Sequence, residues 1–393
     1  MNTDEIKELY GKYVMATYTY EGICLVKGEG SYVEDVDGKK YLDFFPGWAV
    51  SGIGHRHPKV LDGINRQLGR ILHVSNNYFN DVQPVLAKRI IENSFPGKVF
   101  FANSGAEANE AAIKLARKYG NPSRFEIITM ERSFHGRTLA TITATGQDKV
   151  KKGFSPLPEG FRHVPFNDIN AVRNAFTDRT VAVLLEPVQG EGGINVPDVS
   201  YMRELRDLCT DNDVLLMLDE VQTCMGRTGE MFAYKNFGIE PDVMTLAKSL
   251  GGGLPIGAMV AGTKFSEVLT AGTHASTFGG GSVVCAAGLG VFDAIEEGAL
   301  LDNARKMGAY LRASLEKLSK DCGLIGQIKG LGLMLGVVMN MEDATAVPGK
   351  CAKEGLLINC TQKNILRIMP PITVTEEEID EALDKLSKVL EAI

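Results

Sequence analysis

The chain has 393 residues, of which 44% are hydrophobic and 23% are charged, and its formal net charge is -7. This composition is typical of a globular protein, and the length favours two or three domains. No long basic run accompanies the acidic balance, so the charge pattern argues against binding to nucleic acid or to an anionic membrane.

The first residues and the cysteines favour a cytoplasmic protein. The opening ten residues carry acidic side chains and lack the apolar core of a signal peptide, and no apolar run approaches the roughly 18 residues of a membrane span. Seven scattered cysteines form no C-x-x-C pair, and their odd number is typical of reduced thiols. The six histidines form no H-E-x-x-H or similar set, so we expect no bound metal.

The first two thirds of the chain predict a hairpin followed by an α/β sheet. Residues 31–45 read as two short strands around an Asp37-Gly38 turn. Beyond them, short apolar runs alternate with helical stretches, which indicates a largely parallel sheet buried on both faces. The expected strands of this sheet are residues 99–101, 126–130, 181–185, 214–218 and 243–246.

The last third of the chain predicts a smaller α+β part. We expect helices at residues 286–295 and 301–319, a strand at 330–339, and a C-terminal helix with a capping-box spelling at Thr375 and Glu378. A small domain built from both termini would then flank a large central one. The expected boundaries are 1–55 for its N-terminal segment, 56–284 for the large domain and 285–393 for its C-terminal part.

Two opposite charges each follow an apolar strand. Asp219 comes directly after residues 214–218, and Lys248 lies two residues past residues 243–246. In parallel sheets, ligands gather at these carboxyl ends, and one crossover would bring the two side chains to one pocket. Pyridoxal phosphate would satisfy both, because its aldehyde forms a Schiff base with a lysine and its ring nitrogen pairs with a carboxylate. A structural salt bridge is the alternative.

Two further segments fit such a ligand without requiring it. Ser104, Gly105 and Ala106 open a helical run after a strand, and a helix N-terminus offers backbone N–H groups to a phosphate. An ordinary helix cap explains the same residues. Phe134 could cover a planar ring and Arg137 could clamp a carboxylate, although a core phenylalanine and a solvated arginine explain them equally well. The intervening histidine is more often structural than a base.

Seven strings occur in order along the chain: Ser104–Asn109, Phe134–Thr138, Glu186–Glu191, Asp219–Gln222, Arg227–Gly229, Leu246–Lys248 and Leu366–Pro371. Together they resemble the class III aminotransferases, from about residue 28 to the C-terminus. F-H-G-R-T and the late L-R-x-x-P-P place the resemblance nearest to the acetylornithine and ornithine aminotransferases. The resemblance implies a fold type I, pyridoxal phosphate-dependent transferase with a mostly parallel seven-stranded sheet and a smaller α+β domain.

The same resemblance implies roles at the cofactor. Lys248 would form the Schiff base and shuttle a proton, and Asp219 would pair with the pyridine nitrogen. Gln222 would contact the phenolic oxygen, and Phe134 would stack on the ring. The remaining cofactor positions are the phosphate-binding residues Gly105 and Ala106, and Thr277, which would reach the phosphate from the second subunit of a homodimer.

Substrate positions follow from the same resemblance. Ser276 and Arg137 match substrate-binding positions, and Arg137 is expected to hold a carboxylate. Arg367 would bind the α-carboxylate of glutamate, while Glu191 would neutralise Arg367 when an ω-amino substrate is bound, since a buried unpaired guanidinium is expensive. A solvated loop residue is the alternative for Glu191.

Two segments depart from the family pattern. Gly280-Gly281-Ser282 stands where the usual spelling is G-N-P, in the loop that would cross to the partner subunit. Trp48, the only tryptophan, occupies a region where ornithine-using members place a tyrosine and acetylornithine-using members commonly place a small or aliphatic residue.

The expected function is the transfer of the terminal amino group of N-acetylornithine to 2-oxoglutarate in arginine biosynthesis. Ornithine, succinylornithine or 4-aminobutyrate are alternative amino donors. A racemase or aminomutase with the same cofactor, and a non-catalytic binding or regulatory protein on the same fold, are the alternatives from other classes.

Overall fold

A seven-stranded sheet forms the centre of the larger part of the computed structural model, which describes residues 1–393. The strand order is β4-β10-β9-β8-β7-β5-β6, in which all neighbours from β9 to β6 run parallel and β10 is antiparallel to both of its neighbours. The strands are β4 (Gly97–Ala102), β5 (Glu126–Met130), β6 (Phe161–Val164), β7 (Thr180–Leu185), β8 (Leu215–Asp219), β9 (Val243–Leu246) and β10 (Gly257–Gly262).

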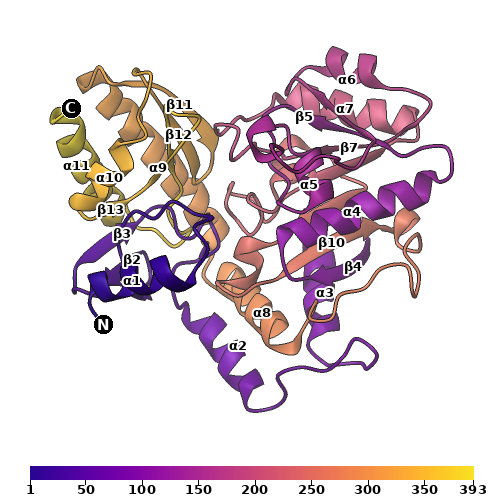
Figure 1. Ribbon diagram of the computed structural model, residues 1–393, viewed down its shortest axis with the longest axis horizontal. Helices are drawn as coiled ribbons and strands as arrows, with labels where there is room; N and C mark the ends of the chain where they lie inside the picture. Colours follow the sequence, from indigo (N-terminus) through magenta and orange to yellow (C-terminus); the bar gives the residue numbers. More distant parts are fainter.

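Helices cover both faces of this sheet (Figure 1). Successive residues of β8 serve opposite faces, because side chains alternate along a strand. Leu215 and Met217 pack in a cluster with α4, whereas Leu216 and Leu218 pack with α7. The helices of this part are α2 (Pro58–Leu68), α3 (Gln83–Asn93), α4 (Gly105–Gly120), α5 (Leu139–Ala144), α6 (Ile169–Ala175), α7 (Val199–Asp211) and α8 (Ser282–Glu297).

Both ends of the chain build the smaller part, where indigo and yellow segments lie side by side in Figure 1. Its first sheet has the order β1-β2-β3-β13, so a C-terminal strand pairs with N-terminal ones, and its second has the order β11-β12-β15-β14. The strands are β1 (Leu25–Glu29), β2 (Tyr32–Asp35), β3 (Lys40–Asp43), β11 (Ile325–Leu331), β12 (Met334–Met339), β13 (Leu356–Leu357), β14 (Asn359–Thr361) and β15 (Ile365–Ile368).

The helices of the smaller part are α1 (Thr3–Tyr13), α9 (Leu300–Asp321), α10 (Val347–Lys353) and α11 (Glu376–Glu391). Thr375 caps α11 in the predicted capping box with Glu378, which confirms that prediction. The hairpin around Asp37-Gly38 is confirmed as β2 and β3. The single strand expected at 330–339 is wrong: the chain reverses after Leu331, with Gly332 at φ 56°, so β11 and β12 pair as a hairpin.

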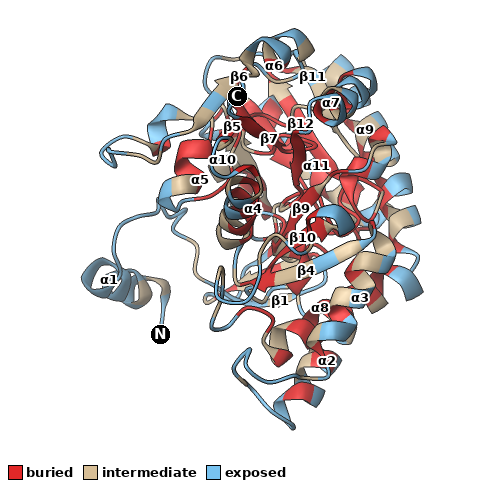
Figure 2. Ribbon diagram, turned by 90° about the vertical axis from the view of Figure 1, so that its right-hand side faces the viewer, coloured by how far each residue is buried: buried red, intermediate tan, exposed pale blue.

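One segment stands away from the body of the molecule. Helix α1 buries none of its residues, and Figure 2 shows it separated from the main body. The chain after it exposes Tyr13, Met15 and Tyr18 at 71%, 82% and 75% of their surface. No helix of the chain combines the length and the apolarity needed to cross a membrane.

The domain boundaries at residues 55 and 284 stay a prediction.

Candidate active site

A cavity of about 490 Å³ opens at the carboxyl ends of β8 and β9. This is the edge at which a parallel sheet presents its loops and helix N-termini, so ligands collect there. Most of the predicted site residues line this cavity: Gly105, Ala106, Phe134, Arg137, Glu191, Asp219, Gln222 and Lys248.

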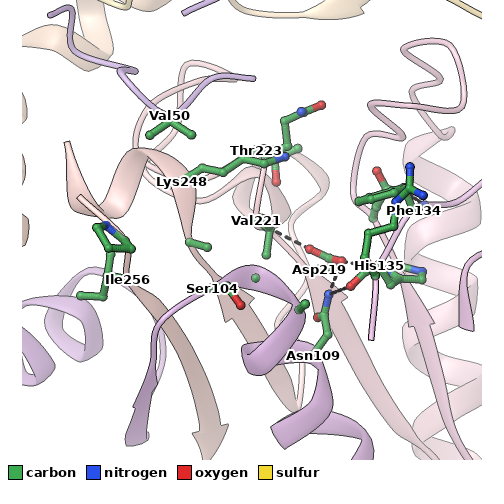
Figure 3. A pocket seen from close by; sticks show the side chains of 18 of the residues that line it. Val50, Ser104, Asn109, Phe134, His135, Asp219, Val221, Thr223, Lys248 and Ile256 are labelled. Carbon is green, nitrogen blue, oxygen red and sulfur yellow. Dashed lines mark hydrogen bonds and ion pairs between the residues drawn. The ribbon is translucent and has the colours of Figure 1, made fainter. Parts of the chain in front are cut away.

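Asp219 is held by three donors at the floor of the cavity (Figure 3). Its Oδ2 accepts a hydrogen bond from Nδ2 of Asn109 at 2.7 Å and lies 2.8 Å from Nδ1 of His135, while its Oδ1 accepts the backbone N–H of Val221 at 3.1 Å. The hydroxyl of Thr245 fixes the Asn109 amide in turn, at 2.7 Å. No lysine or arginine pairs with this 4%-exposed carboxylate, so it is oriented to receive a cationic ligand atom.

Asn109 and His135 show what sequence reasoning missed. In the sequence Asn109 stands out only as the last residue of a family string, and His135 is predicted to be structural. Asn109 lies one helical turn after Gly105, so the helix that opens the phosphate turn also points its amide at Asp219. The available signal was therefore the helical spacing of a polar residue in an otherwise alanine-rich stretch.

Lys248 faces the same cavity from the end of β9. It begins a short 3-10 helix, η3 (Lys248–Gly251), with a left-handed φ of 47°, and Figure 3 shows its side chain extended into the cavity. Burial lowers the pKa of Lys248, while the negative charges of Glu191 and Asp219 act against that shift. The depressed pKa increases the fraction of neutral amine, which is the form that attacks a carbonyl. The alternative interpretation, a structural salt bridge between Lys248 and Asp219, is not observed, because the ion-pair partner of Asp219 is His135.

The start of α4 provides a cradle for an anion. Ser104 caps the helix through the backbone N–H of Glu107, at 3.2 Å, so the ordinary cap exists beside the free N–H groups of the first turn. Gly105 packs closely against Val221: a Cβ on this glycine would lie 2.7 Å from a methyl group of that valine. Glycine at this position therefore avoids a clash with Val221, and the backbone N–H groups of the first turn could face a phosphate.

Two other features fit a planar, oxygen-bearing ring. The amide oxygen of Gln222 is buried and has no hydrogen-bond partner within the chain. Phe134 lines the cavity, and its backbone N–H donates to Oε1 of Glu186 at 2.8 Å. Together with the free amine, the helix N-terminus and the buried carboxylate, this donor and acceptor set fits pyridoxal phosphate.

Glu186 joins two loops of the site. Its Oε1 accepts from the backbone N–H of Phe134 and its Oε2 accepts the backbone N–H of Gly190 at 3.0 Å, so one carboxyl group fixes the segments that carry Phe134 and Glu191. Burial raises the pKa of Glu186 to about 7. In the sequence Glu186 directly follows the predicted strand 181–185 and opens one of the family strings, but neither pattern assigns it a role.

Glu191 and Arg367 form the predicted pair. Nη1 of Arg367 lies 2.5 Å from Oε1 of Glu191, and Oδ1 of Asn359 accepts from Nε at 2.9 Å and from Nη2 at 2.6 Å. The guanidinium also lies 4.8 Å from the ring centroid of Phe45 and 5.0 Å from that of Trp48. Glu191 is thus not the solvated loop residue of the alternative interpretation.

Arg137 reaches the cavity from the loop between β5 and α5. Its side chain is largely exposed, and its guanidinium lies 5.6 Å from the centroid of the Phe134 ring. No acidic side chain forms an ion pair with Arg137. The arginine is consequently free to bind a substrate carboxylate.

Ser276 and Thr277 do not line the cavity of their own chain. Oγ of Ser276 accepts from Nδ2 of Asn103 at 3.1 Å and from the backbone N–H of Gly279 at 3.0 Å, and Thr277 is exposed. The unusual Gly281-Ser282 spelling marks the start of α8, with Gly281 at the N-cap. The single chain therefore leaves Thr277 exposed and Ser276 partly buried, both outside the cavity lining.

Comparison with known proteins agrees with this geometry. A family model described as aminotransferase class-III matches residues 14–390. The chain belongs to the class-III aminotransferase family. Like other class-III aminotransferases, it is a transaminase that depends on pyridoxal 5'-phosphate, with the fold type I architecture predicted from the sequence.

Full-length relatives and solved structures support the same assignment. The aminotransferase is 51% identical to an acetylornithine aminotransferase of Caldanaerobacter subterraneus subsp. tengcongensis, over 97% of this chain and 98% of that one. It is 49% identical to the acetylornithine aminotransferase of Methanothermobacter thermautotrophicus, over 99% of both. The structure of an ornithine aminotransferase from Toxoplasma gondii matches with a TM-score of 0.95 at 31% identity, covering 100% of this chain and 96% of that one.

Proposed function

We propose that this aminotransferase moves the terminal amino group of N2-acetylornithine to 2-oxoglutarate, giving N-acetylglutamate 5-semialdehyde and glutamate in arginine biosynthesis. The observation that carries the proposal is the Arg367–Glu191 ion pair at the cavity that holds Lys248. An enzyme that accepts two different amino substrates in turn needs a cation that binds one carboxylate and is neutralised for the other. The relatives named acetylornithine aminotransferase support the choice of donor.

The chain's own residues divide the work at the cofactor. When bound, pyridoxal phosphate supplies the aldehyde that carries the amino group and a ring that accepts electrons from the reacting carbon. Asp219 would hold a positive charge at the ring nitrogen, and the N–H groups of Gly105 and Ala106 would hold the phosphate. Phe134 would cover the ring and exclude water. The Nζ of Lys248 would hold the aldehyde until the substrate amine takes its place, and the freed lysine amine would then move a proton at the reacting carbon.

The two substrates use different carboxylate contacts. Arg137 holds the carboxylate of acetylornithine, and Glu191 keeps Arg367 neutralised during that half of the reaction. Glutamate or 2-oxoglutarate then displaces Glu191 and places its α-carboxylate on Arg367, where bidentate hydrogen bonds are available. Because the two states differ in which carboxylate pairs with Arg367, one cavity can serve both substrates.

The working unit that we propose is a cytoplasmic homodimer with an active site at the subunit interface. Support comes from Ser276 and Thr277, which lie outside the cavity lining of their own chain, with Thr277 exposed. Phe79 and Phe278 lie exposed at 107% and 65% of their surface, as expected for side chains that a second copy covers. Thr277 would then reach the phosphate site of the partner.

A panel of amino donors tests the substrate assignment. The enzyme is mixed with acetylornithine, ornithine, succinylornithine or 4-aminobutyrate, with and without 2-oxoglutarate, and kcat/KM is compared. Acetylornithine should give the highest value, and turnover should require 2-oxoglutarate. A higher value for one of the other amines would assign that substrate instead, and turnover without any oxo acid would indicate a racemase or aminomutase.

A further inference from the structure

The guanidinium of Arg367 touches two aromatic rings that the catalytic scheme leaves without a role. Phe45 and Trp48, here called the aromatic corner, lie at 5.1 Å between their centroids with an interplanar angle of 68°, so they meet edge to face around the arginine. Phe45 is half-buried, whereas Trp48 is 48% exposed. Aromatic faces attract a guanidinium, and tryptophan does so most strongly.

Strained backbone holds Trp48 in this position. Trp48 and Ala49 have φ angles of 64° and 67°, in the left-handed region that bulky residues rarely adopt. The carbonyl of Ala49 accepts from Oγ of Ser249 at 2.5 Å, and that of Trp48 accepts from Nε2 of Gln222 at 3.5 Å. The turn is thus tied to the neighbour of Lys248 and to a cavity residue, and strain of this kind persists where surrounding contacts enforce it.

The remaining contacts of Arg367 show why its guanidinium needs a further contact to stay in position. Asn359 binds Nε and Nη2, and Glu191 binds Nη1. When Glu191 leaves, the guanidinium loses its only ion pair and keeps a single amide oxygen on one edge. The aromatic corner is then the contact that restricts movement perpendicular to the guanidinium plane. Because the two rings are uncharged, they do not compete with a substrate carboxylate for Arg367.

Resting on the proposed function, we propose that Trp48 is a positioning residue that keeps the guanidinium of Arg367 in place while its partner changes from Glu191 to the α-carboxylate of glutamate or 2-oxoglutarate. The aromatic ring acts only through Arg367. Its loss therefore weakens the dicarboxylate substrates selectively and leaves the acetylornithine half-reaction, which uses Arg137, far less affected.

Two variants of the holoenzyme separate this role from a structural one. Trp48→Leu keeps apolar bulk but removes the aromatic face, and Trp48→Phe keeps a face. Trp48→Leu should raise KM for 2-oxoglutarate about five- to thirty-fold, as expected for a cation–π contact of about 1–2 kcal/mol, with a small change in kcat. Trp48→Phe should restore most of the affinity. Calorimetric titration with glutarate, a dicarboxylate without an amine, should show the same order of Kd.

Three results would contradict a positioning role for Trp48. The proposal is overturned if Trp48→Leu leaves the Kd of glutarate unchanged, if KM for acetylornithine rises as much as KM for 2-oxoglutarate, or if Trp48→Phe behaves like Trp48→Leu. A melting temperature measured for each variant shows whether a general loss of folding explains such a parallel effect. Failure of the proposed function is a separate result, because it is measured on the unmodified enzyme, which would then prefer another amino donor or turn over without 2-oxoglutarate.

Discussion

The burial of Asp219 could be predicted from the sequence, but its hydrogen-bond donors could not. Its position after an apolar strand predicted a buried carboxylate, and the structure places it at the end of β8 with 4% exposure. Its donors Asn109 and His135 come from α4 and from the loop after β5, far apart in the chain. Short-range patterns contain no information on such pairings, so the network emerges only from the packed structure.

Replacing Asp219 with asparagine should slow both half-reactions on the order of a hundredfold or more, because an amide keeps the shape but cannot hold a cation at the ring nitrogen. Rapid-mixing absorbance of each half-reaction measures the effect. Asp242→Asn is the matched control: Asp242 pairs with Arg206 and lies outside the cavity, so its rates should stay near those of the unmodified enzyme. Equal rates for the two variants would contradict the role given to Asp219.

Glu186 predicts a pH dependence of stability. Burial raises its pKa from the ordinary value of about 4.5 to about 7 in the folded chain. The folded state therefore binds a proton that the unfolded state has already released between these values. Stability from Glu186 is fully present below about pH 4.5 and falls by about 1–3 kcal/mol as pH rises through 7.

Urea unfolding of the unmodified enzyme and of Glu186→Gln at pH 5 and pH 7.5 measures this difference. The glutamine variant should lose less stability over that interval, since it has no proton to release. The same loss in both proteins would show that Glu186 does not titrate there.

Strands and helix ends were predicted correctly where a single sequence pattern was strong. Continuous apolar runs located β5, β7, β8 and β9, and the capping box located the start of α11. β10 was not predicted, because Gly257–Gly262 is rich in small residues and lies antiparallel between two strands. β6 was missed for another reason: Phe161–Val164 mixes basic and apolar residues at the sheet edge.

The α11 cap gives a test at this scale. Thr375→Ala removes the hydroxyl that accepts the backbone N–H of Glu378 at 3.3 Å, and it should lower the free energy of unfolding by about 1 kcal/mol. Thr375→Ser keeps the hydroxyl and should stay within a few tenths of a kcal/mol of the unmodified protein. Denaturant titration with circular dichroism measures both. Indistinguishable loss in the two variants would contradict the capping role.

At the scale of the whole molecule, the sequence predicted the two-part architecture and the edge of the sheet at which the cavity lies. It did not predict which exposed residues would contact a second copy. Periodicity reports which residues are buried within a chain and says nothing about which exposed ones meet a second copy. The exposed Phe79 and Phe278 and the outward-facing Thr277 became visible only once the chain was folded.

Sedimentation should therefore show a species of about twice the chain mass of 42.6 kDa. Phe79→Glu places a charge in the expected interface and should shift the population toward single chains, with a matching loss of activity because Thr277 no longer reaches a partner site. Phe154→Glu, at another exposed phenylalanine, is the control. A fully active single chain would contradict the shared site.

The most direct test of the central claim follows one nitrogen atom. Acetylornithine labelled with ¹⁵N at its terminal amine is incubated with the enzyme, pyridoxal phosphate and 2-oxoglutarate, and the glutamate formed is analysed by mass spectrometry. The label should appear in glutamate with the unmodified enzyme and not with Lys248→Ala. Unlabelled glutamate, or equal labelling by the Lys248→Ala variant, would contradict an amino-group transfer that depends on this lysine.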